Sequence, residues 1–131
     1  MSFGTIEKHR IIAEDELFTI ARDKYPVSPG HTLIIVKRIV ARFKELSSEE
    51  KARLIKWIDW CIDYLQSTLS PEPDGFNVGL NDGAAAGQTI AQLHVHIIPR
   101  YYGDVPDPRG GVRFVIPERG KYWDSEKYSM L

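Results

Sequence analysis

Two of the four histidines in the sequence stand two positions apart in a short apolar segment, residues 91–100. Side chains alternate across a β-strand, so apolar residues 93, 95 and 97 share one face, whereas Gln92, His94 and His96 share the other. The pattern predicts a largely buried strand that carries a row of imidazoles on one side.

Two imidazoles on one strand face suit more than one chemistry. Their backbones lie about 7 Å apart, so they could chelate zinc with a third ligand from His31, Asp23 or Asp82. A neutral imidazole, whose ordinary pKa is near 6.5, could instead attack phosphorus. A third interpretation is that both histidines are structural, and the spacing alone leaves the three open.

The loop before this strand points to a bound anion. Residues 83–89 contain two glycines and three alanines, so their backbone can approach a ligand closely and present amide hydrogens. Thr89 adds a hydroxyl group at the end of the loop. A phosphate held by these groups would lie beside His94.

The remaining segments predict the sheet that positions these residues. Alternating or β-branched runs indicate strands over residues 10–14, 17–23, 31–37 and 75–81, with His31 at a loop-to-strand junction. The last of these carries Asn77 and Asn81 on its polar side. If it pairs antiparallel with the histidine strand, the two polar rows share a face.

One long helix is expected between the third and fourth strands. Ser47 and Glu50 have the spacing of a capping box, which starts a helix by satisfying two of its first amides. Apolar residues then recur at spacings of three and four until Pro71 ends the run. Three strands, a helix and two more strands indicate an α+β domain with the helix on one face of the sheet.

Length and composition limit the class of protein. A chain of 131 residues, 43% of them hydrophobic, fits one domain, expected over residues 1–105. Residues 106–131 are expected to form a tail that is too rich in Pro and Gly for regular structure and that packs on the same domain. A net charge of −1 gives no basic field for nucleic acid, and no apolar run reaches the ~20 residues of a membrane helix. The single cysteine, Cys61, excludes an internal disulfide and suits the cytoplasm.

Taken together, the loop and strand resemble the histidine triad (HIT) family. Its motif, His-x-His-x-His, follows a Gly-Gln-Ser/Thr loop, and residues 87–98 read Gly-Gln-Thr-Ile-Ala-Gln-Leu-His-Val-His-Ile-Ile. The likeness extends to residues 81–83 and 29–31, and the ending Pro99-Arg100 is most similar to the fragile histidine triad branch and to bacterial dinucleoside polyphosphate hydrolases. One departure is that Gln92 occupies the position of the first histidine.

The resemblance implies a HIT-like antiparallel sheet of about five strands with one long helix packed on it. It also implies a nucleotide hydrolase that cleaves dinucleoside polyphosphates, such as diadenosine tri- or tetraphosphate, through a covalent nucleotidyl-histidine. A nucleoside phosphoramidate hydrolase and a nucleotide-binding regulatory protein are the alternatives. We expect a homodimer, no nucleic-acid or membrane partner, and no permanently bound metal or cofactor, with Mg²⁺ entering only on the polyphosphate.

The resemblance also assigns roles to individual residues. His94 takes the position of the nucleophile, His96 that of a hydrogen-bond donor to phosphate or leaving group, and His31 completes the cluster. The amide of Gln92 can donate a hydrogen bond in place of a positioning histidine. The other implied contacts are with phosphate, from Asn81, Gly87, Gln88 and Thr89, and with ribose, from Asp23.

Overall fold

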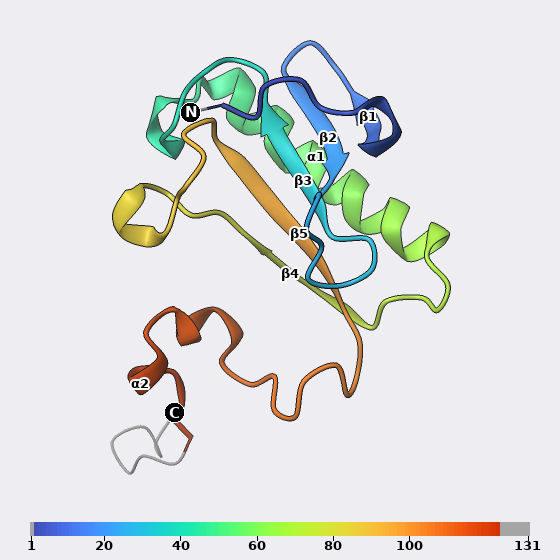
Figure 1. The fold of residues 1–131 in the computed structure, drawn as a ribbon, viewed down its shortest axis with the longest axis vertical. Helices are drawn as coiled ribbons and strands as arrows, with labels where there is room; N and C mark the ends of the chain where they lie inside the picture. Colours follow the sequence, from blue (N-terminus) through green and yellow to red (C-terminus); the bar gives the residue numbers. More distant parts are fainter. Residues whose placement is uncertain (1, 124–131) are drawn as a thin grey trace. The chain divides into compact units, whose positions relative to one another are not determined.

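The structure of the protein, a computed structural model, describes residues 2–123 (Figure 1). The chain divides into two compact units, residues 1–101 and residues 102–131. Within residues 2–123, no helix is both long and apolar enough to cross a membrane.

The first unit contains a five-stranded sheet in the order β1-β2-β3-β5-β4, and all neighbouring strands are antiparallel. A single long helix, α1 (Ser48–Thr68), lies between β3 and β4 in the chain. The α+β architecture expected from the sequence is therefore confirmed. The strands are β1 (Ile11–Glu14), β2 (Phe18–Arg22), β3 (Thr32–Val36), β4 (Gly75–Gly79) and β5 (His94–Arg100).

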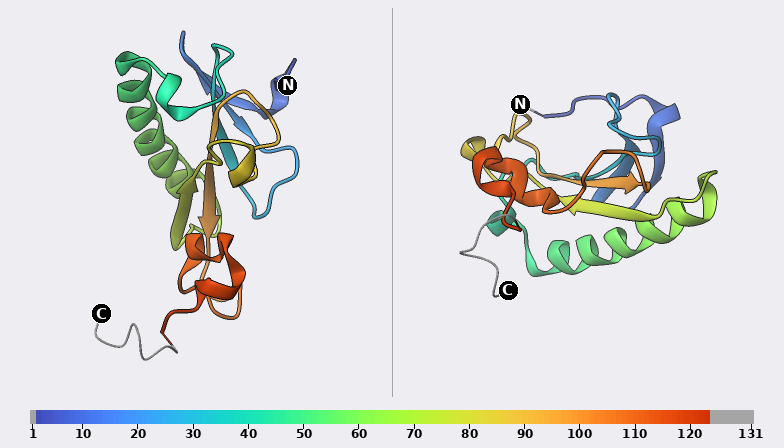
Figure 2. Two further views of the ribbon diagram at one scale, coloured as in Figure 1. Left: turned by 90° about the vertical axis from the view of Figure 1, so that its left-hand side faces the viewer. Right: turned by 90° about the horizontal axis from the view of Figure 1, so that it is seen from below.

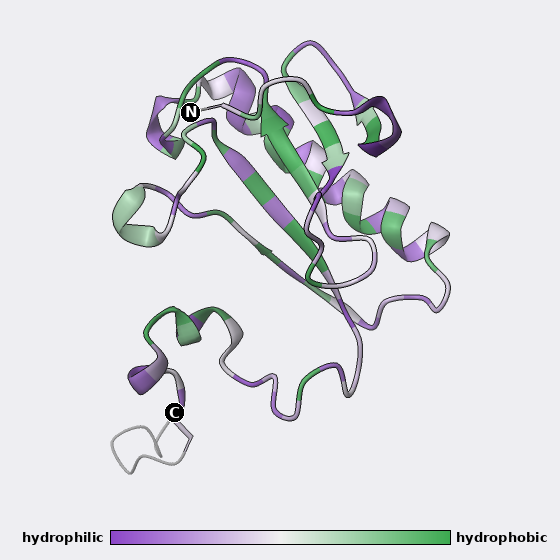
Figure 3. Ribbon diagram, in the orientation of Figure 1, coloured by the Kyte–Doolittle hydropathy of each residue, from purple (hydrophilic) through white to green (hydrophobic). Residues whose placement is uncertain are grey.

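Strand β5 has the alternation expected of the histidine strand. Val95 and Ile97 are buried on the face toward α1, which we call the helix face, while His94 and His96 are partly exposed on the opposite, pocket face. The alternation appears as bands along β5 in Figure 3. The strand begins at His94 rather than at residue 91, because the amide of Leu93 donates to the carbonyl of Val40 in the preceding loop.

Helix α1 begins as the sequence predicts. The Ser47 side chain accepts a hydrogen bond from the Glu50 amide, and the Glu50 carboxylate accepts one from the Ser47 amide. The helix lies along one face of the sheet, as the right-hand view of Figure 2 shows. Its stripe of Leu54, Cys61 and Leu65 is buried there, and burial raises the pKa of the Cys61 thiol to about 12. Cys61 is therefore a packing residue rather than a reactive thiol.

The opposite face of the sheet is covered by the N-terminal segment, residues 2–10. Ala21, Leu33 and Ile35 form a second, smaller apolar cluster on the pocket face, and Phe3 and Ile6 pack against it. Figure 2 shows this segment on the side of the sheet away from α1. The N-terminal segment thus covers β2 and β3 on this face, and the histidines of β5 lie on the same face.

Within the second unit, residues 102–123 form two short helices, η4 (Gly111–Val115) and α2 (Pro117–Gly120), where the sequence indicates no regular structure. That expectation was wrong because Pro117 suits the first turn of a helix and Arg113 donates to the carbonyls of Arg119 and Gly120. Residues 124–131 of the expected tail lie outside the described residues. That the tail packs on the first unit stays a prediction.

The buried Glu50 generates a prediction for stability. The Arg38 guanidinium, hydrogen-bonded to this carboxylate, lowers the pKa of Glu50 from 4.5 to about 2. A lowered folded-state pKa stabilises the fold above the unfolded pKa, and the gain is lost as pH falls toward 2. Glu50→Gln should lower the unfolding free energy by about 2 kcal/mol near neutral pH, measured by urea denaturation.

The difference between wild type and Glu50→Gln should shrink as the pH is lowered through about 4, because the wild-type carboxyl then becomes protonated on unfolding. Glu49→Gln is the matched control, since the Glu49 side chain is 73% exposed in the same helical turn. If Glu50→Gln has the same unfolding free energy as wild type near neutral pH, the Arg38 contact adds no stability.

Candidate active site

The strand register places both histidines beside small or apolar residues. In the β3–β5 pair, Ile35 lies opposite His94 and Leu33 opposite His96. On the other side, Gly79 of β4 lies opposite His96, and a side chain at Gly79 would meet no atom within 4 Å. The missing side chain leaves space next to His96 on the pocket face.

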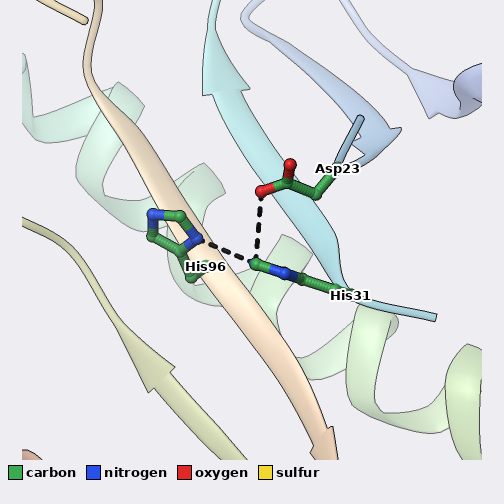
Figure 4. Close-up of side chains that lie close together, drawn as sticks. All are labelled: Asp23, His31 and His96. Atoms are coloured by element: carbon green, nitrogen blue, oxygen red, sulfur yellow. Dashed lines mark hydrogen bonds and ion pairs between the residues drawn. The ribbon is translucent and has the colours of Figure 1, made fainter. Parts of the chain in front are cut away.

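His96 is connected to His31 and Asp23 by a short chain of polar contacts (Figure 4). The Nδ1 atom of His96 lies 2.9 Å from Nε2 of His31, and that Nε2 lies 3.4 Å from a carboxylate oxygen of Asp23. On its other side, His31 Nδ1 accepts a hydrogen bond from the amide of Val27. The three side chains come from the end of β2, the start of β3 and β5.

The hydrogen bonds of His31 determine the tautomers of this chain. Since a backbone amide only donates, Nδ1 of His31 is the acceptor and the proton of the neutral ring is on Nε2. That proton is donated to Nδ1 of His96, so the proton of neutral His96 is on its own Nε2. His96 therefore presents a ring N–H as a hydrogen-bond donor.

The pKa values of both rings support this neutral arrangement. Burial lowers the pKa of His31, and the Asp23 carboxylate only partly opposes the effect. Burial also lowers the pKa of His96, and the neighbouring His94 and His31 lower it further. Both imidazoles are thus neutral at neutral pH, as a chain of single N–H donors requires.

His94 has the opposite tautomer. Its Nδ1 atom lies 2.9 Å from the backbone carbonyl oxygen of Gln92. A carbonyl oxygen only accepts, so Nδ1 carries the proton and Nε2 is left with a lone pair. An imidazole with an unprotonated Nε2 is a nucleophile, whereas the ring of His96 two residues away is a donor.

The loop after β4 has the backbone geometry that the sequence indicates. Gly83 and Gly87 have φ angles of +101° and +92°, a region that favours glycine, and they flank the short helix η3 (Ala84–Ala86). The Gln88 side chain accepts from the Gly83 amide and donates to the carbonyls of Ala41 and Ile90. Gln88 therefore holds the loop in shape, and its amide group is used in doing so.

A pocket of about 470 Å³ brings the loop and the histidines together. It lies between the start of the N-terminal segment, the end of β2, the loop after β4, and β5. Ser2, Phe3 and Thr5 form one wall of the pocket, which no sequence pattern indicates because single apolar and polar residues near a terminus carry no periodicity. Among the residues expected in the site, its lining includes Asp23, Asn81, Gly87, Thr89, His94 and His96.

Two polar residues of the expected site region lie elsewhere. Asp82 accepts hydrogen bonds from Arg42 and from the amide of Phe43, so it belongs to the outer side of the loop. Asn77 shares the pocket face, as predicted from strand pairing, but its side chain accepts from Arg100 near the other end of β5. Asn81, at the nearer end, is the asparagine that reaches the pocket.

Gln92 is buried, and its side-chain amide bonds to backbone groups rather than to the imidazoles. Its oxygen accepts from the Phe3 amide at 3.1 Å, and its nitrogen donates to the carbonyl of Val36. A direct catalytic role for this amide stays a prediction. Its backbone carbonyl, in contrast, contacts His94 directly.

Within the described residues, Asp23, His31 and His96 could together hold a metal ion, since their ligand atoms lie within 4.8 Å of one another. The pair of histidines in this cluster is His31 and His96, not the His94 and His96 pair that the spacing suggests. Of these atoms, Nε2 of His31 and Nδ1 of His96 already lie 2.9 Å apart, within hydrogen-bonding distance. That the protein has no resident metal stays a prediction.

The chain of neutral imidazoles generates a prediction for titration by NMR. The ring resonances of His31 and His96 should titrate with midpoints below the ordinary value of 6.5, because burial disfavours their charged forms. Asp23→Asn should lower both midpoints further, since the carboxylate raises both pKa values. Asp63→Asn, on the exposed side of α1, is the control. Midpoints above 6.5, or midpoints unmoved by Asp23→Asn, would contradict the assigned contacts.

Comparison with known proteins places this site in a family. The AP-4-A phosphorylase of Mycobacterium tuberculosis is 35% identical over 99 residues, which are 75% of this chain and 50% of the relative. The bis(5'-adenosyl)-triphosphatase of Dictyostelium discoideum is 38% identical over 98 residues, covering 72% of this chain and 62% of the relative. The chain thus spans only about half to two-thirds of the length of these curated relatives.

A solved structure and a family model agree with these relatives. The NitFhit protein of C. elegans superposes with a TM-score of 0.71 and 28% identity, over 86% of this chain and 26% of that one. The model of the HIT domain matches residues 5–103, a range that includes Asp23, His31, the loop after β4 and all of β5. The chain belongs to the HIT domain family.

Proposed function

We propose that the protein is a nucleotide hydrolase that cleaves dinucleoside polyphosphates, such as diadenosine tri- or tetraphosphate, at the α-phosphate. The observation that carries the proposal is the hydrogen bond from His94 Nδ1 to the Gln92 carbonyl, which leaves the Nε2 lone pair in a pocket beside a glycine-containing loop. The relatives named for diadenosine polyphosphates supply the substrate class.

The reaction proceeds in two displacements at the α-phosphorus. Nε2 of His94 forms a bond to phosphorus while the bond to the bridging oxygen breaks, and the rest of the polyphosphate leaves. Water then attacks the nucleotidyl-histidine, forms the mononucleotide and returns His94 to its starting state. Two easier steps replace one difficult step.

The donors around phosphorus stabilise the charge that develops. The N–H of His96 donates to a phosphate oxygen or to the leaving group, and the hydroxyl of Thr89 binds an α-phosphate oxygen. The Gly87 amide donates to the Ala84 carbonyl, so Gly87 contributes by letting the backbone approach the α-phosphate closely. Asn81 lies beside them, and Gln88 contributes by holding the loop. Donors fixed in place before the reaction are the expected main source of rate enhancement.

Asp23 is proposed to bind the ribose. One carboxylate oxygen accepts from the Tyr25 amide and the other lies near His31, yet each oxygen has a second lone pair for a ribose hydroxyl. The carboxylate therefore links the sugar to the His31–His96 chain. In this proposal the protein acts as a homodimer in the cytoplasm without a resident metal, and Mg²⁺ arrives bound to the polyphosphate.

A panel of substrates with product identification tests the function. Diadenosine triphosphate, diadenosine tetraphosphate and an adenosine phosphoramidate are each incubated with the protein, with and without inorganic phosphate. Release of AMP from a polyphosphate supports the proposal. Faster cleavage of the phosphoramidate supports the alternative amine-releasing hydrolase, release of ADP only with phosphate indicates phosphorolysis, and binding without turnover indicates a regulatory protein.

Removal of the nucleophile should separate turnover from binding. His94→Ala is expected to abolish nearly all turnover while nucleotide binding, measured by calorimetry, persists, because the phosphate loop and Asp23 remain. His9→Ala is the matched control, since the His9 side chain is 78% exposed. Turnover close to wild type in His94→Ala would eliminate the proposed mechanism.

Removal of Asp23 should show whether the carboxylate holds the sugar. Asp23→Ala is expected to weaken binding of a ribonucleotide by about tenfold relative to its effect on the 2′,3′-dideoxy nucleotide, because only the ribose hydroxyls lose hydrogen bonds. Any effect that passes through His31 weakens both ligands equally, so the ratio isolates the sugar contact. Equal weakening of the two nucleotides would assign Asp23 to the histidines alone.

A further inference from the structure

Gln92 joins the N-terminal segment to the centre of the sheet. Its side-chain oxygen accepts a hydrogen bond from the amide of Phe3, 89 residues away in the chain, and its nitrogen donates to the carbonyl of Val36 at the end of β3. Gln92 is only 8% exposed, so its bond to Val36 is buried and its bond from Phe3 is partly buried. Because these two bonds use the oxygen and the nitrogen of the amide, they fix the position of the Phe3 backbone on the pocket face.

The ring of Phe3 lies against the nucleophile. Its centroid is 4.8 Å from that of His94, with an angle of 88° between the rings, the edge-to-face geometry that aromatic pairs prefer. His96 lies on another side of His94, with a centroid distance of 5.2 Å. The His94 imidazole is therefore held by a carbonyl at Nδ1 and by two rings.

The carbonyl alone would leave the His94 ring loosely held. A single hydrogen bond at Nδ1 fixes one atom of the imidazole, and the ring can still tilt about that contact. Contact with Phe3 restricts the tilt, which keeps the Nε2 lone pair in one direction. A nucleophile held in the attacking direction reacts faster than one that samples many orientations.

We infer that Gln92 and Phe3 form a positioning pair: the Gln92 amide anchors the N-terminal segment so that the Phe3 ring holds the His94 imidazole in the attacking orientation. This inference rests on the proposed role of His94 as nucleophile. Gln92, which replaces the first triad histidine, thus supports His94 in two ways. Its backbone carbonyl contacts His94 directly, and its side chain acts indirectly by holding Phe3. Phe3 also becomes a wall of the nucleotide pocket.

A double-mutant cycle distinguishes this role from direct contact with substrate. Gln92→Met removes both amide bonds at similar size, and Phe3→Ala removes the ring while keeping the backbone amide that Gln92 binds. If Gln92 acts through Phe3, the effects of the two substitutions overlap, and the double variant is no worse than the more damaging single one. If Gln92 contacts substrate on its own, the effects multiply.

The first readout does not depend on activity. The rate of acylation of His94 by diethylpyrocarbonate, followed by mass spectrometry of the digested protein, reports how accessible Nε2 is and how firmly the ring is held. Each single variant is expected to react about tenfold faster than wild type, and the double variant no faster than the faster single one. Rates equal to wild type, or rates that multiply in the double variant, would overturn the inference.

The second readout is the kcat for a dinucleoside polyphosphate, expected to fall about tenfold in each single variant and no further in the double variant. Gln66→Met is the matched control, because Gln66 is exposed on α1. If Phe3→Ala lowers stability, Phe3→Leu replaces it in the cycle. Leucine keeps an apolar side chain against Ala21 and Leu33 but has no aromatic ring. Circular dichroism confirms that each variant is folded.

The two readouts separate failure of the inference from failure of the proposed function. If wild type turns over no dinucleoside polyphosphate, the function is wrong, while the acylation cycle still decides whether Gln92 and Phe3 hold His94. If wild type is active and the kcat effects of Gln92→Met and Phe3→Ala multiply to about a hundredfold, the positioning pair is wrong and the function stands.

Discussion

The chemistry proposed for this protein depends on one hydrogen bond, from Nδ1 of His94 to the backbone carbonyl of Gln92. A carbonyl accepts and never donates, so it decides which nitrogen of His94 keeps the proton and which keeps the lone pair. The same logic, applied from the Val27 amide through His31, gives His96 the opposite tautomer. Two histidines in one strand thus have opposite tautomers because their hydrogen-bond partners differ, which suits the nucleophile and donor roles proposed for them.

The sheet fixes the face on which both imidazoles lie. Alternation along β5 buries Val95 and Ile97 against α1 and presents both imidazoles on the other face, so a shift of one residue would reverse the two sets. On the face that carries the imidazoles, the N-terminal segment packs against β2 and β3, and its Phe3 ring contacts the His94 ring. The capping box and the Glu50–Arg38 contact stabilise α1, which packs on the helix face of the sheet.

Sequence predicted the parts of the site that depend on local pattern. The alternation of β5, the capping box at Ser47 and the glycines of the loop are all short-range features, and each has the predicted conformation. The partners of Gln92 lie 56 and 89 residues away, so no local pattern could indicate that its amide binds Val36 and Phe3. Likewise, the spacing of His94 and His96 suggested that they act as a pair, whereas the fold pairs His96 with His31 through a contact of 65 residues' separation.

His94 is proposed to form a covalent bond to phosphorus through Nε2, and the stereochemical course at phosphorus is the most direct test of that bond. Each in-line displacement inverts the configuration, so two displacements give net retention. A dinucleoside polyphosphate made chiral at the α-phosphorus with sulfur and oxygen isotopes should yield a mononucleotide of retained configuration when hydrolysed in isotopically labelled water. A product of inverted configuration would mean that water attacks phosphorus directly and would contradict the account, even for an efficient enzyme.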